Sequence, residues 1–145
     1  MTGNCQVDFY VIEDESLSPE LLVCRLALMA WEQGNRIIVL VDNEARAKQM
    51  DKLMWETPQG RFLPHEVMAK PGFAPVKIGT VRELEDDAAE VIINLTREAV
   101  PSPERFRRLL ELVPSNDSQR KVSREKFRAY RNLGLKPESH TIKRD

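Results

Sequence analysis

The chain has 145 residues, of which 41% are hydrophobic and 31% charged, and its formal net charge is −1 at pH 7. This composition is typical of one globular domain, and it excludes a disordered chain and a protein that coats nucleic acid with its whole surface. No apolar run approaches the roughly 20 residues of a membrane span, and the first residues lack a basic and apolar signal sequence, so we expect a cytoplasmic protein.

The chain begins with a strand pattern that is followed by a helix pattern. Residues 7–12 predict a strand, while Ser18 as N-cap, Pro19 at the first helical position and Gly34 as the stop delimit a helix. Residues 36–41 are apolar on both faces, as expected for a central strand of a parallel sheet. This part of the chain therefore predicts a strand–helix–strand unit.

A second helix pattern follows that central strand. Asn43 or Asp42 can cap its first turn, and the pattern ends near Trp55. The order of strands and helices predicts an α/β fold with a mostly parallel central sheet and helices on both faces. The arrangement is Rossmann-like, but it lacks a Gly-rich nucleotide loop. We place this single domain over residues 1–136.

The middle of the chain is less regular. Prolines and glycines divide residues 56–75 into loops around a short strand predicted at Phe62 and Leu63. Residues 76–78 predict a further strand, and the continuous apolar run at 91–95 predicts another buried one.

The last third of the chain predicts one more strand and one more helix. Residues 106–113 predict a helical turn that leads into the last strand. Asn116 or Asp117 can cap the final helix, and Gly134 is placed to end it. Residues 137–145 are polar, so we expect a mobile C-terminal tail.

The final helix concentrates positive charge. Residues 118–136 hold seven Lys or Arg and one acid, a local charge of +6, so the rest of the chain has 15 basic and 22 acidic groups, a charge of −7. At 3.6 residues per turn, one face holds Arg120, Arg124, Phe127, Arg128 and Arg131, and the opposite apolar stripe holds Val122, Ala129 and Leu133. We therefore expect Phe127 to lie outside the core. A ring among guanidinium groups suits a partner that offers an apolar anchor and negative charge together. The alternative is a solvated helix whose Phe127 covers a neighbouring loop.

The acids that follow the first two predicted strands leave a magnesium site open as an alternative. Glu13, Asp14 and Asp42 could converge at two strand ends and hold a magnesium ion for phosphoryl transfer. Such a site needs a further carboxylate at the next central strand, where the chain offers only Asn94. The simpler interpretation is that these acids are solvated capping groups, so we expect no cofactor, no metal and no catalytic residue.

A second candidate surface lies at the end of the second helix. Trp55, Pro58, Phe62 and Pro64 fall within ten positions, and loop aromatics beside prolines can form a rigid apolar patch. These aromatics could equally cover one end of the sheet as part of the core.

The order and spacing of several motifs indicate a family. They are Val7-Asp-Phe-Tyr-Val, Gly34-Asn-Arg-Ile-Ile-Val-Leu, Leu53-Met-Trp-Glu-Thr-Pro, Phe62-Leu-Pro-His, Val113-Pro-Ser-Asn-Asp-Ser and Arg124-Glu-Lys-Phe-Arg-Ala-Tyr-Arg, with Gly134 after them. Over nearly its whole length, the chain resembles the chi subunit of the bacterial DNA polymerase III holoenzyme.

The resemblance implies a non-catalytic adaptor of the clamp-loader assembly in DNA replication. It implies two partners, the small psi subunit and the acidic C-terminal tail of single-stranded DNA-binding protein, which ends in phenylalanine; the latter would bring the chain to nucleic acid indirectly. The implied tail-binding residues are Val113, Arg120, Arg124, Phe127, Arg128 and Gly134. The implied psi-binding surface centres on Trp55 and Phe62, and a repair helicase could share it.

The resemblance also suggests a separate role for each of the tail-binding residues. We expect Arg124 to hold the terminal carboxylate, Val113 and Phe127 to border the slot for the phenylalanine, and Arg120 and Arg128 to attract upstream acids. Two positions depart from the family, which commonly has Tyr in place of Phe127 and an aromatic residue in place of Leu135. The alternative function is a direct nucleic-acid-binding module that uses the same arginines on phosphates.

Overall fold

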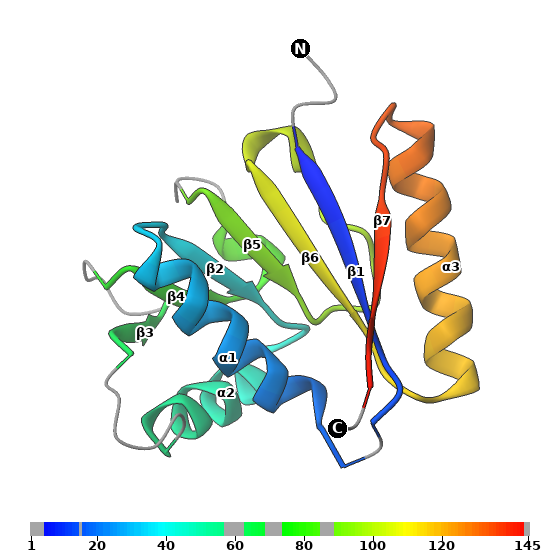
Figure 1. The fold of residues 1–145 in the computed structure, drawn as a ribbon. Coiled ribbons are helices and arrows are strands. Elements are labelled where there is room, and N and C mark those ends of the chain that lie inside the picture. Colours follow the sequence, from blue (N-terminus) through cyan, green and yellow to red (C-terminus); the bar gives the residue numbers. More distant parts are fainter. Residues whose placement is uncertain (1–4, 15, 57–62, 69–73, 85–88, 144–145) are drawn as a thin grey trace.

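The computed structural model describes residues 5–14, 16–56, 63–68, 74–84 and 89–143. Within these ranges, seven strands form one parallel sheet in the order β3-β4-β2-β5-β6-β1-β7 (Figure 1). The strands are β1 (Gln6–Ile12), β2 (Ile37–Leu40), β3 (His65–Val67), β4 (Val76–Gly79), β5 (Val91–Asn94), β6 (Arg108–Val113) and β7 (Glu138–Ile142). The helices are α1 (Pro19–Glu32), α2 (Glu44–Glu56) and α3 (Asp117–Asn132), with short 3-10 helices η1 (Val81–Glu83) and η2 (Pro103–Arg105). The predicted α/β fold is confirmed.

Local signals start and end the first two helices as predicted. Ser18 caps α1 by accepting a hydrogen bond at Oγ from the Leu21 amide, at 3.2 Å. Gly34 follows the helix with a φ of +90°, a left-handed conformation that glycine adopts without strain. The first turn of α2 is capped by Asn43, whose Oδ1 accepts from the Arg46 amide at 2.9 Å.

The two faces of the sheet carry separate apolar cores. On one face, α1 and α2 pack over the sheet through side chains such as Val23, Ala27 and Met50. On the other face, α3 and the segments around η1 and η2 pack against a second cluster that includes Phe9 and Tyr130. Figure 1 shows α1 and α2 together over one half of the sheet and α3 beside the other half. None of the helices within the described ranges is both long and apolar enough to cross a membrane.

The short strand predicted in the middle of the chain lies elsewhere. It begins at His65, two residues beyond Leu63, which is buried but lies outside the strand. Phe62 lies outside the described residues. The prediction followed the apolar pair, whereas the register is set by backbone pairing of His65 with Val76 at the edge of the sheet.

The expectation of a mobile tail is wrong over β7. Residues 138–142 pair in parallel with β1, so β6 is not the last strand. The strand is polar because it lies at the edge of the sheet and both of its faces are largely exposed, which removes the apolar pattern that a buried strand shows. A polar side chain also fastens it: His140 Nε2 lies 2.8 Å from Asp8 Oδ1 on β1.

Asp8 is a buried carboxylate, and its hydrogen-bond partners allow its negative charge to stabilise the fold. Its Oδ2 accepts from the Arg108 guanidinium at 2.9 Å. Burial alone would raise the pKa of Asp8, but hydrogen bonds from His140, Arg108 and Gln6 outweigh it and hold the pKa below its ordinary value. Such an acid stabilises the fold above its unfolded-state pKa, and the stabilisation is lost as the pH falls through the folded-state pKa.

We therefore expect Asp8→Asn to lower the free energy of unfolding at pH 7 by roughly 2 kcal/mol, because charge-assisted hydrogen bonds are lost. The difference from the wild type should shrink as the pH falls below about 4, because the carboxylate of the unfolded chain takes up a proton there while the native carboxylate, whose pKa is lower, stays ionised. Urea unfolding between pH 3 and 7 measures both effects, with Glu125→Gln, an exposed acid on α3, as the control. If the difference in free energy of unfolding between Asp8→Asn and the wild type stays the same across that pH range, the charge of Asp8 is not what stabilises its contacts with β6 and β7.

Candidate functional site

The basic helix α3 begins and ends where the sequence predicts. Asn116 caps it, with Oδ1 accepting from the amides of Ser118 at 3.0 Å and Gln119 at 3.3 Å. Gly134 follows its last turn with a φ of +87°, and a Cβ at that position would meet no atom within 4 Å. Gly134 is therefore required for its backbone conformation rather than for close packing.

The face that α3 turns to the sheet differs from the prediction. Its buried residues are Ser123, Lys126 and Tyr130, all polar or partly polar. The predicted apolar stripe does not face the core, because Leu133 is 52% exposed. The apolar pattern failed as a guide here because the contact of α3 with the sheet is made largely by buried hydrogen-bonding groups.

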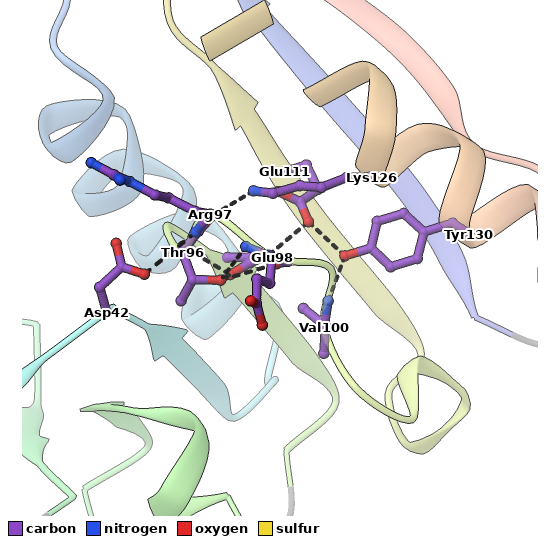
Figure 2. A network of polar contacts seen from close by, with 9 residues as sticks. Asp42, Thr96, Arg97, Glu98, Val100, Glu111, Lys126 and Tyr130 are labelled. Carbon is purple, nitrogen blue, oxygen red and sulfur yellow. Dashed lines mark hydrogen bonds and ion pairs between the residues drawn. The ribbon is translucent and has the colours of Figure 1, made fainter. Parts of the chain in front are cut away.

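A buried polar network joins α3 to two strands (Figure 2). Lys126 Nζ lies 2.9 Å from Glu111 Oε1 on β6, and it also donates to the Thr96 carbonyl in the loop after β5. The other carboxylate oxygen of Glu111 accepts from Asn94 Nδ2 at 2.7 Å and from the Tyr130 hydroxyl. These bonds fix the rotation of α3 about its axis, and with it the direction of its outer side chains.

Burial and charge oppose each other at this network. Burial raises the pKa of Glu111, while the Lys126 charge and the hydrogen bonds from Tyr130 and Asn94 favour its ionised form. Burial also raises the pKa of Tyr130, and the neighbouring Glu111 charge adds to that effect. Tyr130 therefore stays a neutral donor to Glu111, and its oxygen accepts from the Val100 amide at 2.8 Å.

A groove of about 600 Å³ lies between α3 and strands β1 and β7. We call it the α3 groove. Its lining residues are Phe9, Val11 and Glu13 from β1 and the loop after it, Val113 from β6, Asp117, Arg120, Ser123, Arg124, Phe127 and Arg128 from α3, and Ser139 from β7. Five of the six predicted tail-binding residues line this groove: Val113, Arg120, Arg124, Phe127 and Arg128.

Phe127 borders the groove without being fully exposed. It is half-buried, and its ring packs on Phe9 of β1 with the centroids 5.2 Å apart. Phe9 also packs against Tyr130, at 6.1 Å between centroids. The sequence placed Phe127 outside the core, whereas the structure places it at the edge of the second core, with part of the ring available to the groove.

The cations along the groove are available to a partner. Arg120, Arg124 and Arg128 are exposed on successive turns of α3. Among the described residues, none of the three forms an ion pair or a hydrogen bond through its guanidinium group. The groove thus combines an apolar floor with three guanidinium groups that have free donors, whereas its two acids, Glu13 and Asp117, come from the end where α3 begins.

Two predicted positions do not line the groove. Gly134 ends α3, as described above. Leu135 is 5% exposed and belongs to the core beneath the end of the helix, so the leucine that departs from the family pattern is not a groove wall here.

Sequence reasoning missed the floor of the groove. Phe9 and Val11 point to the same side of β1, and Ser139 of β7 pairs with Phe9. The alternation of residues 7–12 contains the signal that Phe9 and Val11 share a face. The position of β7, however, follows only from its pairing in the sheet, and no pattern in a polar tail indicates that pairing.

The second candidate surface is partly described. Trp55, in the last turn of α2, is 61% exposed, and its ring lies against His65 with the centroids 4.8 Å apart. His65 is held by Leu63 and Asp51, since Nδ1 lies 2.6 Å from the Leu63 carbonyl and Nε2 lies 3.1 Å from the Asp51 carbonyl. The exposure of Trp55 argues against a purely core role. Phe62, the other predicted residue of this surface, lies outside the described residues.

The magnesium alternative is not supported by the geometry. Glu13, Asp14 and Asp42 do not come together among the described residues. The reason is the strand order: β5 and β6 separate β1 from β2, so the two strand ends are about 14 Å apart. The described group that could geometrically hold a metal is Asp8, Glu138 and His140, but the Arg108 cation already lies 2.9 Å from Asp8.

Comparison with known proteins gives a consistent result. A family model described as DNA polymerase III chi subunit, HolC, matches residues 5–138. The DNA polymerase III subunit chi of Pseudomonas aeruginosa is 36% identical over 140 residues, which cover 96% of this chain and 98% of that protein. The subunit chi of Escherichia coli is 27% identical over 142 residues, covering 93% and 97%, and that of Haemophilus influenzae is 25% identical over 129 residues, covering 87% and 90%.

Proposed function

The chain belongs to the DNA polymerase III chi subunit family, a family of accessory and not catalytic subunits, and on that premise we propose that it acts as an adaptor. One surface, the α3 groove, binds the acidic C-terminal tail of single-stranded DNA-binding protein. A second surface around Trp55 binds the psi subunit. The adaptor would hold the clamp-loader assembly on DNA that is coated by the single-stranded DNA-binding protein.

The observation that supports the tail-binding half is the composition of the α3 groove. An acidic peptide that ends in phenylalanine carries an apolar ring, a terminal carboxylate and upstream acids. The groove offers an apolar floor of Phe9, Val11 and Val113 for the ring, and guanidinium groups that have no partner among the described residues for the negative charges. Bridging two partners raises their effective concentration, so contacts of micromolar affinity are sufficient for such a role.

The proposal assigns the parts of the peptide to particular residues. Arg124 holds the terminal carboxylate, because its fork can bind both carboxylate oxygens and it lies one turn from Phe127 and the apolar floor. The terminal ring lies between Val113 and Phe127. Arg120 and Arg128, one turn to either side of Arg124, attract the upstream acids through screened, salt-dependent interactions.

The test is the binding of two fluorescent peptides, measured by anisotropy. One peptide is acidic and ends in Ile-Pro-Phe, and the other lacks only the terminal phenylalanine. We expect binding to the first and a loss of about tenfold or more with the second, because burial of the ring contributes roughly 1.5–3 kcal/mol. Equal binding of both peptides, together with tight binding of single-stranded DNA, would contradict the proposal and would favour a module that binds phosphates directly.

The exposure of Trp55 supports the second half of the proposal. An exposed indole supported from one side by His65 is a rigid apolar surface, and tryptophan is enriched among residues that dominate binding energies. Psi is the partner that the family implies for this surface, and a repair helicase is a second candidate for the same position.

We expect Trp55→Ala to weaken binding of the psi subunit by about 30-fold, the effect of a loss of roughly 2 kcal/mol at a dominant interface residue. Surface plasmon resonance with immobilised psi measures the change. Met29→Ala is a matched control, because Met29 is another exposed apolar side chain, at 56%, on a different helix. Binding of the acidic peptide should be unchanged in both variants. A similar loss in Met29→Ala, or no loss in Trp55→Ala, would remove the assignment of psi to this surface.

A further inference from the structure

The free edge of the sheet at β7 lies beside the α3 groove. β7 is the last strand in the sheet order, and among the described strands it pairs with β1 alone. Figure 1 shows β7 between β1 and α3, and Ser139 of β7 lines the groove. An unpaired strand edge presents a row of backbone donors and acceptors that can pair with another extended chain. We call this free edge of residues 138–142 the β7 edge.

The pairing with β1 fixes which backbone groups lie at the β7 edge. The Ile142 carbonyl accepts from the Glu13 amide at 2.9 Å, so the backbone groups of Ile142 are directed to β1. Successive residues of a strand direct their backbone groups to opposite edges. The N–H and C=O groups of Ser139 and Thr141 are therefore directed away from β1, and they have no hydrogen-bond partner among the described residues. Both residues are exposed.

The β7 edge lacks the features that usually keep a strand edge from pairing with another chain. Proteins protect such edges with prolines, β-bulges and charged side chains. β7 contains no proline, and its five residues pair with β1 in continuous register, without a bulge. The small, neutral side chains of Ser139 and Thr141 share the face that carries the α3 groove, while Glu138 and His140 are directed to the opposite face. A chain that approaches from the groove thus meets neither a charge nor a bulky side chain on β7.

The arginines of α3 match an extended acidic chain along this edge. Arg120, Arg124 and Arg128 follow one another at intervals of four residues, a rise of about 6 Å per step. In an extended strand, alternate residues lie about 6.6 Å apart and direct their side chains to the same face. Acids at alternate positions of a strand on the β7 edge therefore face successive arginines. The open backbone groups and the row of cations together favour an extended acidic peptide.

The distance from the floor of the groove to the β7 edge also fits the peptide. β7 is next to β1 in the sheet, so a strand added at the β7 edge lies two strand spacings from β1, about 10 Å. Three extended residues span about that distance. A terminal Ile-Pro-Phe can thus reach from the floor to the edge, and its proline, which has no N–H to donate, lies outside the paired segment.

We infer that the acidic segment before these three residues binds as an additional strand at the β7 edge, paired with the backbone of Ser139 and Thr141. This inference rests on the proposed function and specifies how the same peptide is held. The terminal ring and carboxylate lie in the α3 groove, and the upstream segment extends the sheet. Recognition by backbone pairing in this way is a recurring mode of peptide binding.

A series of modified peptides tests the inference by fluorescence anisotropy with the wild-type protein. Each peptide has one upstream amide replaced by an ester, which removes one N–H and keeps the side chain. We expect affinity losses of about two- to tenfold at every second position and smaller losses between them, because alternate N–H groups of an added strand face β7. Similar effects at all positions, or no effect at any of them, overturn the inference.

A pair of variants tests the same contact from the side of the protein. Thr141→Pro removes an N–H that the pairing with β1 does not use, and proline is tolerated at such positions of edge strands. Thr141→Ala keeps this N–H and controls for the loss of the side chain. We expect Thr141→Pro to bind the unmodified peptide about two- to tenfold more weakly than Thr141→Ala, and equal affinities overturn the inference. If Thr141→Pro does not fold, the ester series still decides, since it uses the wild-type protein.

The outcomes also separate this inference from the proposed function. If binding requires the terminal phenylalanine but the ester effects do not alternate, the peptide occupies the α3 groove without the β7 edge, and this inference alone is overturned. If the unmodified peptide does not bind, both are overturned. Sedimentation of the protein alone tests a second copy as the occupant. A dimer that Thr141→Pro disrupts and Thr141→Ala does not would assign the β7 edge to self-association and overturn the inference.

Discussion

Arg124→Ala is expected to weaken binding of the acidic, phenylalanine-terminated peptide by about 10- to 100-fold. Arg124 is exposed, lines the α3 groove and has no partner among the described residues, so its guanidinium can give both of its parallel N–H groups to the terminal carboxylate. A hydrogen bond to a charged group contributes roughly 1.5–3 kcal/mol, which corresponds to that range of affinities. Fluorescence anisotropy at fixed salt measures the change.

Two further variants make this result specific. Arg131→Ala removes an equal charge from the same helix but lies outside the residues that line the groove, so it should change the affinity by less than about threefold. Arg124→Lys keeps the charge and loses the planar fork, so it should recover only part of the affinity. Equal losses in Arg124→Ala and Arg131→Ala would mean that the helix attracts the peptide by its overall charge and that Arg124 does not bind the carboxylate.

Lys126→Met is expected to lower the free energy of unfolding by roughly 3–5 kcal/mol. The methionine leaves Glu111 buried, 1% exposed, without its compensating cation, and an uncompensated buried charge is strongly destabilising. The Thr96 carbonyl loses its donor at the same time. Urea unfolding at pH 7, followed by circular dichroism, measures the loss.

The buried charge can be separated from the change in packing. Glu111→Gln in the Lys126→Met background removes the negative charge while keeping an acceptor for Tyr130, so the double variant should be more stable than Lys126→Met alone. Lys121→Met is the matched control on the exposed side of α3 and should stay within about 0.5 kcal/mol of the wild type. If Lys126→Met is no less stable than Lys121→Met, the network does not anchor the helix.

Most of the α/β framework could be predicted from the sequence because its signals are local. Ser18 and Asn116 cap helices at the predicted positions, and Gly34 and Gly134 follow the helix ends with positive φ. The buried strands are continuous apolar runs, which parallel strands covered on both faces must be. These features depend on neighbours within a few positions along the chain.

The features that were predicted wrongly depend on contacts between distant segments. The buried face of α3 is polar because Lys126 meets Glu111 on β6, a pair that helical periodicity cannot reveal. The edge strand β7 is formed because β1 pairs with it, although its own sequence is that of a polar tail. The arginines of the groove were found because they share a helix face, whereas the floor at Phe9 was missed because strand order decides what lies beneath that face.

The position of β1 has a consequence for the time at which the molecule becomes functional during its synthesis. β1 lies between β6 and β7, both of which come from the last 40 residues of the described chain. β1 therefore has no neighbour in the sheet until β6 has been synthesised. The α3 groove needs β1, β6, α3 and β7 together, so an unfinished chain lacks its walls. A nascent or prematurely terminated chain that lacks β6, α3 or β7 would then lack the groove altogether.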